Sequence, residues 1–150
     1  MSLRALRRED FVFQLTLQTR WMDCDAYGHV NNVIYYSWFD TAATRMLFAH
    51  GLLWMHDCPS IGLCVESHCQ FFAPIEFPHN VDACVRVGHL GSKSLRYDIG
   101  LFRDGADEPA AAGHCVHVFV ERSSRRPVAF TPEQCRIAQS LMMGAKAHGS

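Results

Sequence analysis

The stretch that decides the fold runs from Arg20 to Ala43 and reads RWMDCDAYGHVNNVIYYSWFDTAA. Its second half and the residues after it repeat apolar side chains every three or four positions, which predicts an amphipathic helix over 31–49. The expected apolar face consists of Ile34, Tyr35, Trp38, Phe39, Ala42, Met46 and Leu47. His50 and Gly51 are typical of a helix end. The first half places two aspartates, a cysteine, a histidine, a glycine and two asparagines directly before this helix.

On either side of the helix the apolar pattern has a period of two, which is typical of strands. The expected strands cover 11–19, 61–73, 80–90, 94–103 and 111–121. In the first of them, Phe11 and Phe13 should share one face. A short helix should start after Thr131, with Thr131 as its cap and Pro132 at its first position. One apolar helix and a five-stranded antiparallel meander can bury each other only if the sheet curls around the helix, which predicts an α+β fold.

Composition bounds the class of protein. The chain has 150 residues and a formal net charge of -1, so we expect one domain over 1–150 and no nucleic-acid partner. No segment approaches the roughly 18 consecutive apolar residues of a membrane span, and no signal peptide is recognisable, so a cytoplasmic protein without a membrane partner is expected. The seven cysteines form no CxxC pair and no zinc-ligand spacing, so we expect reduced thiols.

The motif HCVH at 114–117 could suggest a metal site. On a strand, however, residues three positions apart point to opposite faces. No metal site is therefore predicted.

The element order and the string DCDAYGHVNNVIYYSWFDTAA resemble the hotdog-fold thioesterases, specifically the 4-hydroxybenzoyl-CoA thioesterase-like branch of acyl-CoA hydrolases. The resemblance extends over nearly the whole chain and includes CQFFAPIEF and VGHLGSKSLRYDIGLFR. It implies a hotdog fold, with a five-stranded antiparallel sheet curled around one long central helix. It also implies an acyl-CoA substrate, CoA being part of the substrate and no separate cofactor being needed. Family members assemble as homodimers or homotetramers and build each active site across an interface.

The same resemblance assigns roles to residues. The catalytic carboxylate is the aspartate three positions before the glycine, here Asp25 before Gly28, and backbone N–H groups near Asn32 polarise the thioester carbonyl. The benzoyl-specific members carry bulky apolar or aromatic residues where this chain has His29, Asn31 and Asn32, so a preference for aromatic acyl groups is not implied.

Elementary chemistry supports such a site. The first N–H groups of a helix lack partners and carry the positive end of the helix dipole, so they suit an oxyanion. Asp25 could act as general base or as nucleophile, and the sequence does not choose between them. A turn or cap role for Asp25 is the simpler alternative. Asp23 is expected to be a solvated loop carboxylate, and Gly28 to permit a left-handed turn.

Neighbouring side chains have alternatives of their own. Cys24 and His29 could form a nucleophilic pair, but an unreactive buried thiol is the more usual state of cysteine. His29 could instead orient Asp25, bind the substrate carbonyl or simply pack at the helix start. Asn31 suits a helix cap or a substrate contact.

Candidate substrate-binding residues lie elsewhere in the chain. Glu66 and His68 share a strand face and could line an acyl pocket. Lys93, Arg125 and Arg126 are loop cations that could hold the phosphates of CoA.

The function expected is therefore an acyl-CoA thioesterase. The alternatives are a non-catalytic acyl-CoA-binding hotdog sensor or regulatory module, and an acyl-carrier-protein thioesterase, because one fold hosts several functions. A hotdog dehydratase or hydratase is disfavoured, because these enzymes usually rely on a different histidine-containing motif.

Overall fold

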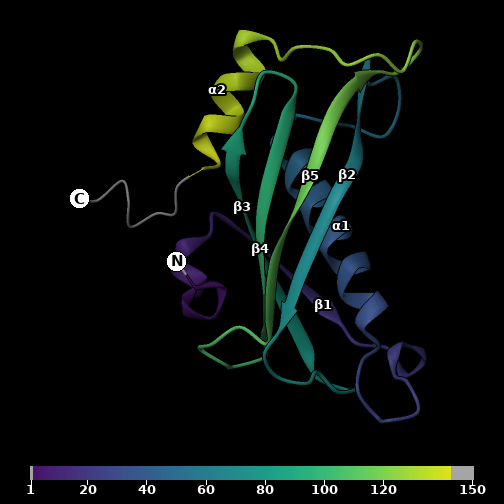
Figure 1. The fold of residues 1–150 in the computed structure, drawn as a ribbon, viewed down its shortest axis with the longest axis vertical. Helices are drawn as coiled ribbons and strands as arrows, with labels where there is room; N and C mark the ends of the chain where they lie inside the picture. Colours follow the sequence, from purple (N-terminus) through teal and green to yellow (C-terminus); the bar gives the residue numbers. More distant parts are fainter. Residues whose placement is uncertain (1, 143–150) are drawn as a thin grey trace.

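The protein is described here from a computed structural model, in which residues 2–142 are placed (Figure 1). Its elements in chain order are η1 Leu3–Ala5, η2 Arg8–Asp10, β1 Phe13–Gln18, η3 Trp21–Asp23, α1 Asn32–Ala49, β2 Ser60–Phe71, β3 Asn80–Leu90, β4 Ser94–Arg103, β5 Ala111–Glu121 and α2 Pro132–Ser140. The last three strands begin and end where the sequence predicts. Thr131 caps α2 and Pro132 opens it, also as predicted.

The sheet is fully antiparallel, with the strand order β1-β3-β4-β5-β2. The predicted meander is therefore correct only for β3, β4 and β5. The strand β2 pairs with β5, so Ser60 lies opposite Glu121 and Phe71 opposite Ala111. The reason lies in the connection 72–79, which is longer than a hairpin turn and contains two prolines. It runs from β2 at one edge of the sheet to β3 near the other edge, so β2 and β3 do not pair.

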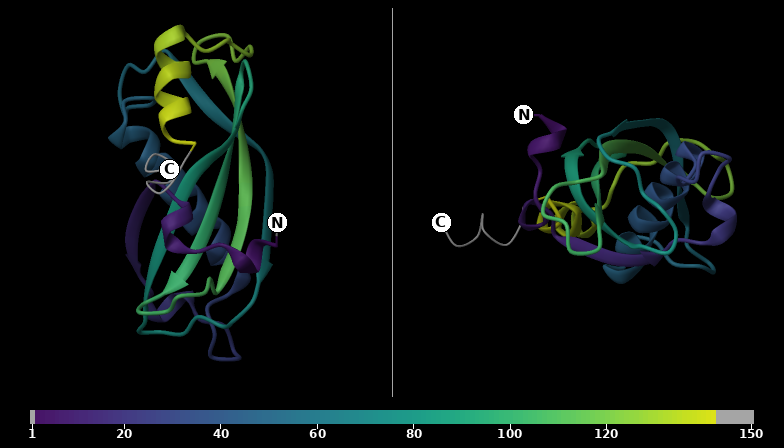
Figure 2. Two further views of the ribbon diagram at one scale, coloured as in Figure 1. Left: turned by 90° about the vertical axis from the view of Figure 1, so that its left-hand side faces the viewer. Right: turned by 90° about the horizontal axis from the view of Figure 1, so that it is seen from below.

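The helix α1 lies in the concave side of the sheet, which curls around it (Figures 1 and 2). Its buried face consists of Tyr35, Trp38, Phe39, Ala42, Ala43, Met46 and Leu47, so all the predicted positions are buried except the half-buried Ile34. The alternate side chains of β3 and β4 complete this core. Two register shifts, at Cys64/Glu66 in β2 and at Val87/His89 in β3, bend the strands. None of the helices within residues 2–142 is long and apolar enough to cross a membrane.

The N-terminal segment covers part of the outer face of the sheet (Figure 2). There Leu6 and Phe11 pack with Phe102 in a second apolar cluster, and the rings of Phe11 and Phe102 meet edge to face at 6.3 Å. The prediction that Phe11 and Phe13 share a face is therefore wrong. The strand begins only at Phe13, and the residues before it turn away to cover the opposite side of the sheet.

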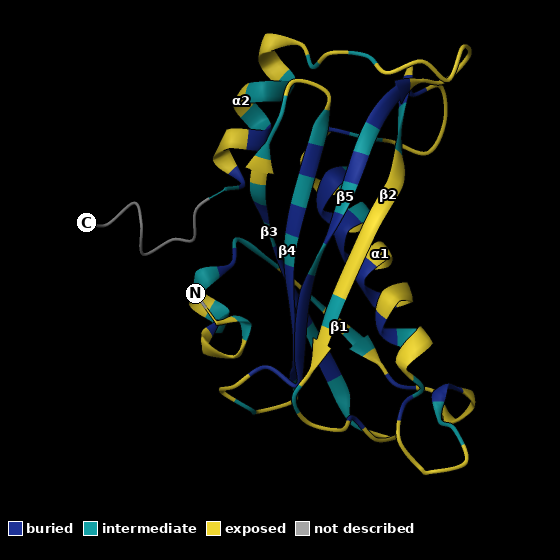
Figure 3. Ribbon diagram, in the orientation of Figure 1, coloured by how far each residue is buried: buried dark blue, intermediate teal, exposed yellow. Residues whose placement is uncertain are grey.

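Burial is uneven across the sheet. The strands β3, β4 and β5 are largely buried, whereas β2 is exposed along most of its length (Figure 3). Since β2 is an edge strand, one row of its backbone groups is available to another strand.

Candidate active site

The loop before α1 is a tight, hydrogen-bonded turn. Cys24 and Val30 form an isolated antiparallel bridge, the Asp25 N–H donates to the His29 carbonyl at 2.9 Å, and the Gly28 N–H donates to the Asp25 carbonyl at 3.1 Å. Gly28 has φ 84°, a left-handed conformation that favours glycine, as predicted. The Val30 N–H donates to the Ile75 carbonyl at 2.8 Å, which fastens the loop to the chain that follows β2.

Asp23 anchors this loop from inside. Its side chain is only 1% exposed, and it accepts hydrogen bonds from the backbone N–H and the guanidinium of Arg20 at 2.8–3.0 Å. Its own carbonyl accepts from the Asn31 N–H at 2.8 Å. The expectation of a solvated Asp23 carboxylate is therefore wrong, because the 3₁₀ turn Trp21–Asp23 folds this side chain back over its own start.

Asp25, two residues later, faces a pocket. Its Oδ1 accepts from the Tyr27 N–H at 2.9 Å, the geometry of an Asx turn. Within the described part of the chain, Oδ2 has no hydrogen-bond partner. The side chain is thus held by one oxygen and offers the other to a ligand.

The start of α1 supplies a hydrogen-bond donor to the same place. Asn31 is the helix cap, and its side-chain oxygen accepts from the Val33 N–H at 3.1 Å. No residue between 2 and 142 accepts a hydrogen bond from the Asn32 N–H, which belongs to the first helical residue. An unpaired amide at the positive end of an 18-residue helix is suited to a developing oxyanion.

These groups line an open pocket of about 370 Å³, called here the Asp25 pocket. It is formed by Asp25, His29, Val30, Asn32, Tyr35 and the strand end Phe71, Phe72, Ala73 and Pro74. Tyr35 and Phe71 meet edge to face at 4.9 Å, and burial raises the pKa of the Tyr35 hydroxyl to about 12. Tyr35 was expected in the core and is buried there, but its function as a pocket wall, like that of 71–74, was not predicted.

His29 lines the pocket, and within residues 2–142 its side chain makes no hydrogen bond or ion pair with the Asp25 carboxylate. Its Nε2 is 3.8 Å from Glu76 Oε1, and both side chains are about half exposed. The backbone carbonyl of His29, by contrast, holds the Asp25 N–H. This backbone contact is not the predicted orientation of Asp25 by the His29 side chain, which stays a prediction together with the other roles considered for His29.

Glu66 and His68 share a face of β2, as predicted, but it is the outer one. Glu66 Oε2 lies 2.7 Å from His114 Nε2, and the rings of His68 and His114 stack at 5.4 Å. The inner face at this end of β2 belongs to Cys69 and Phe71, which contact α1. The structure therefore does not bring Glu66 and His68 to the Asp25 pocket.

The three predicted phosphate cations lie together at the far end of the sheet. The Lys93 carbonyl accepts a hydrogen bond from the Phe119 N–H. Both arginines belong to the turn that follows β5, where the backbone N–H of Glu121 donates to the carbonyl of Arg126. The Asp25 pocket adjoins the opposite end of this strand pair, at Phe71. Along β5 this separation is about ten residue steps, or roughly 35 Å. Within one protomer, the candidate phosphate-binding residues Lys93, Arg125 and Arg126 are therefore far from Asp25.

The two histidines of HCVH point to opposite faces, as predicted. His114 contacts Glu66 on the outer face, whereas His117 is buried beside Tyr97, with its Nδ1 3.2 Å from the tyrosine hydroxyl. Burial lowers the pKa of His117 below its usual value. Among residues 2–142 there is no group of three or more histidine, cysteine, aspartate or glutamate side chains suited to a metal ion.

An antiparallel sheet curled around one long central helix is the architecture of the hotdog-fold thioesterases. The chain belongs to the thioesterase-like superfamily, whose family model matches residues 19–138. The resemblance found in the sequence is thereby confirmed at the level of the superfamily. No curated protein matches the chain.

Solved structures agree with this membership. The PA5185 protein from Pseudomonas aeruginosa strain PAO1 is 44% identical, covers 91% of this chain and 96% of its own, and has a TM-score of 0.86. BH1999, a gentisyl-coenzyme A thioesterase, is 26% identical, with 84% and 98% covered and a TM-score of 0.72. A DHNA-CoA thioesterase from Staphylococcus aureus, 16% identical, shares the fold, with 91% and 94% covered and a TM-score of 0.76.

Proposed function

We propose that this protein hydrolyses an acyl-CoA thioester to the free acid and CoA, with Asp25 as the reacting carboxylate. The observation that carries the proposal is the shared pocket, in which neither Asp25 Oδ2 nor the Asn32 N–H has a hydrogen-bond partner among residues 2–142. In the reaction, the thioester carbonyl accepts a hydrogen bond from the Asn32 N–H. Its oxygen becomes an oxyanion in the transition state, where that hydrogen bond and the helix dipole stabilise it most.

Two routes use the same geometry. In the first, Asp25 takes a proton from water, the water oxygen attacks the acyl carbon, and the CoA thiolate leaves and receives the proton. In the second, Asp25 attacks the acyl carbon directly, CoA leaves as a thiolate, and water cleaves the resulting mixed anhydride. Neither route requires a separate cofactor, because CoA enters as part of the substrate.

A CoA thioester is the substrate best supported by the relatives. The gentisyl-coenzyme A thioesterase is more than a quarter identical over almost its whole length. An acyl-carrier-protein thioester remains the alternative. It would present the same thioester to Asp25 and would differ only in what lies outside the pocket.

The complete site would be shared between two copies of the chain. Edge strand β2 is long and exposes apolar side chains, with Val65 61% and Phe71 47% exposed. Pairing of two β2 edges in antiparallel fashion would join two sheets by a two-fold axis. The start of β2 in one copy would then lie beside its end in the other. This arrangement would bring Lys93, Arg125 and Arg126 of the second copy towards the Asp25 pocket of the first, and it supports a homodimer or a homotetramer.

The function can be tested by incubating the wild-type protein with a panel of thioesters and measuring the free thiol that hydrolysis releases. The panel should contain acyl-CoAs that differ in chain length, branching and ring content, together with acyl-carrier-protein forms of the acids that react best. Turnover of at least one acyl-CoA is expected. Tight binding of acyl-CoA without hydrolysis of any thioester would instead favour the sensor.

A further inference from the structure

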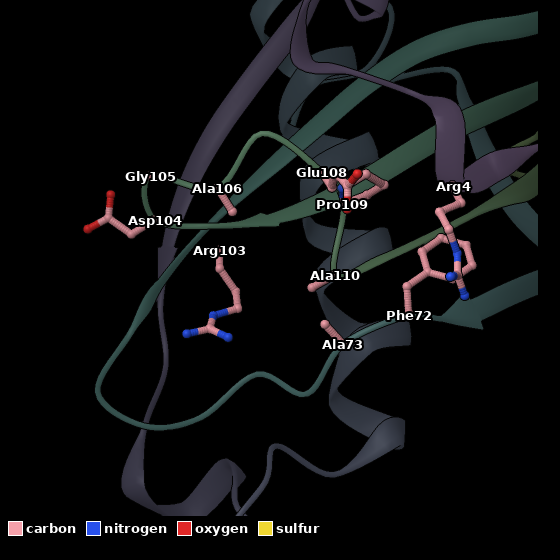
Figure 4. Close-up of a pocket in the computed structure, with 10 residues that line it drawn as sticks. All are labelled: Arg4, Phe72, Ala73, Arg103, Asp104, Gly105, Ala106, Glu108, Pro109 and Ala110. Atoms are coloured by element: carbon pink, nitrogen blue, oxygen red, sulfur yellow. The ribbon is translucent and has the colours of Figure 1, made fainter.

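A second cavity lies beside the Asp25 pocket and takes no part in the proposed reaction. Its volume is about 440 Å³, and we call it the Arg103 pocket (Figure 4). It is lined by Arg4, Phe72, Ala73, Arg103, Asp104, Gly105, Ala106, Glu108, Pro109 and Ala110. Phe72 and Ala73 also line the Asp25 pocket, so the two cavities share a wall.

The frame of this pocket is fixed by hydrogen bonds. The guanidinium of Arg8 donates to the carbonyls of Arg103 and Ala106 at 3.1 and 2.9 Å and also pairs with Asp82. On the other side, the N–H groups of Phe72 and Ala73 both donate to the Ala110 carbonyl. The 104–110 connection is therefore held to the sheet at several points, and the cavity exists before any ligand binds.

Two arginines face this cavity from different elements. Arg4 comes from the N-terminal 3₁₀ turn, and its guanidinium carbon lies 4.8 Å from the centre of the Phe72 ring. A guanidinium stacked in this way keeps its N–H edge free for a second partner. Arg103 ends β4, and no ion pair or hydrogen bond engages its guanidinium within residues 2–142. In Figure 4, Ala73 and Ala110 lie between the two arginine side chains, and we call these two alanines the floor of the pocket.

The acidic side chains of the pocket do not neutralise these arginines. Glu108 lies 3.6 Å from a third arginine, Arg7, which is its partner. The Asp104 carboxylate points outward, away from Arg103 and Arg4 (Figure 4). The three arginines Arg4, Arg7 and Arg103 outnumber the two carboxylates Asp104 and Glu108. The charges of Arg4 and Arg103 therefore remain available to a ligand in the cavity.

We infer that the Arg103 pocket binds a dianion, with one carboxylate or phosphate group on Arg103, the other on Arg4 and an apolar or neutral spacer over the floor. A guanidinium recognises these planar or tetrahedral oxyanions with paired N–H donors. Ala73, Pro109 and Ala110 offer no hydrogen-bonding side chain, so they suit the spacer. Such a ligand could be a short dicarboxylic acid or the bisphosphate end of a nucleotide.

Binding can be measured directly, without turnover. Amide chemical shifts of the wild-type protein should be followed during titration with succinate, glutarate, adipate and adenosine 3′,5′-bisphosphate, and with valerate as a monoanion of the same length as glutarate. The expected result is a saturable change at Gly105, Ala106 and Ala110, tighter for a dianion than for valerate. A response to the dicarboxylates identifies an organic acid as the ligand, and a response to the bisphosphate identifies a nucleotide.

Variants decide whether the arginines are responsible. Arg103→Gln and Arg4→Gln should each weaken dianion binding about tenfold or more, the scale of one charge-assisted hydrogen bond. Arg103→Lys should retain part of the affinity, and Arg136→Gln on the exposed face of α2 should retain all of it. Asp25→Asn should also bind normally, so the result does not depend on the proposed hydrolysis. No saturable change at these amides, or equal affinity in wild type and both glutamine variants, would overturn the inference.

Discussion

Replacement of Asp25 by asparagine should abolish most turnover while leaving the fold intact. Asparagine keeps an oxygen that can accept the Tyr27 N–H at the 2.9 Å position of Asp25 Oδ1, so the turn should survive. It loses the basicity and the effective nucleophilicity of the second oxygen. Loss of a positioned acid or base typically costs about 10²- to 10⁴-fold in rate. That range corresponds to about 3–5 kcal/mol on the activation barrier.

The assay is steady-state thiol release from the best acyl-CoA, with acyl-CoA affinity and thermal unfolding measured in parallel. Substrate affinity and the free energy of unfolding should change little, because the side chain is only half-buried and keeps its backbone hydrogen bond. Cys24→Ser is the matched control in the same loop and should retain most activity. Full activity of the asparagine variant, or loss of activity only in the serine variant, would refute the assignment of Asp25.

Three further predictions concern other parts of the chain. Neutralising Lys93, Arg125 or Arg126 should raise the KM for acyl-CoA several-fold and leave kcat and the KM for acyl-pantetheine unchanged; equal effects on both substrates would contradict a phosphate role. Light scattering at micromolar concentration should show a dimer or a tetramer, and a stable, active monomer would contradict the shared site. Because burial lowers the pKa of His117 from 6.5, the unfolded chain binds this proton more readily than the folded one. The contribution of neutral His117 to the free energy of unfolding should therefore be fully present above about pH 6.5. Below that pH the free energy of unfolding, measured by urea titration from pH 5 to 8, should fall by at most about 1.4 kcal/mol per pH unit. His117→Gln should flatten that slope.

Local periodicity was enough to predict the helix and most strand boundaries. The strands β3, β4 and β5 are joined by short connections, and strands joined in this way usually lie side by side, so their order in the sheet could also be predicted. The partner of β2 could not be predicted in this way. A period of two tells which side chains share a face, but it carries no information on which strand lies alongside. The outer position of Glu66 and His68 follows from that unknown pairing together with the register shift at Cys64/Glu66.

The aspartate loop was recognisable as a site, but its surroundings were not. The wall formed by 71–74 reaches Asp25 through a hydrogen bond between Val30 and Ile75, residues that are far apart in the chain, and no local pattern announces such a contact. The same limit applies to Asp23, whose burial depends on a single 3₁₀ turn that is too short to leave a period in the sequence.

The crowding of polar groups before α1 follows from a division of tasks among them. The Asp23 side chain is engaged by Arg20, and its carbonyl holds the Asn31 N–H. The Asn31 side chain caps the helix by accepting the N–H of the second helical residue. Once these bonds are formed, one oxygen of Asp25 and the N–H of Asn32 are left without partners in the described part of the chain, and both line one pocket. On an isolated turn, a carboxylate and an amide N–H would each be solvated and mobile. The surrounding polar residues hold the Asp25 oxygen and the Asn32 N–H in fixed positions without bonding to them. Groups fixed in this way can stabilise a transition state without a rearrangement of the site.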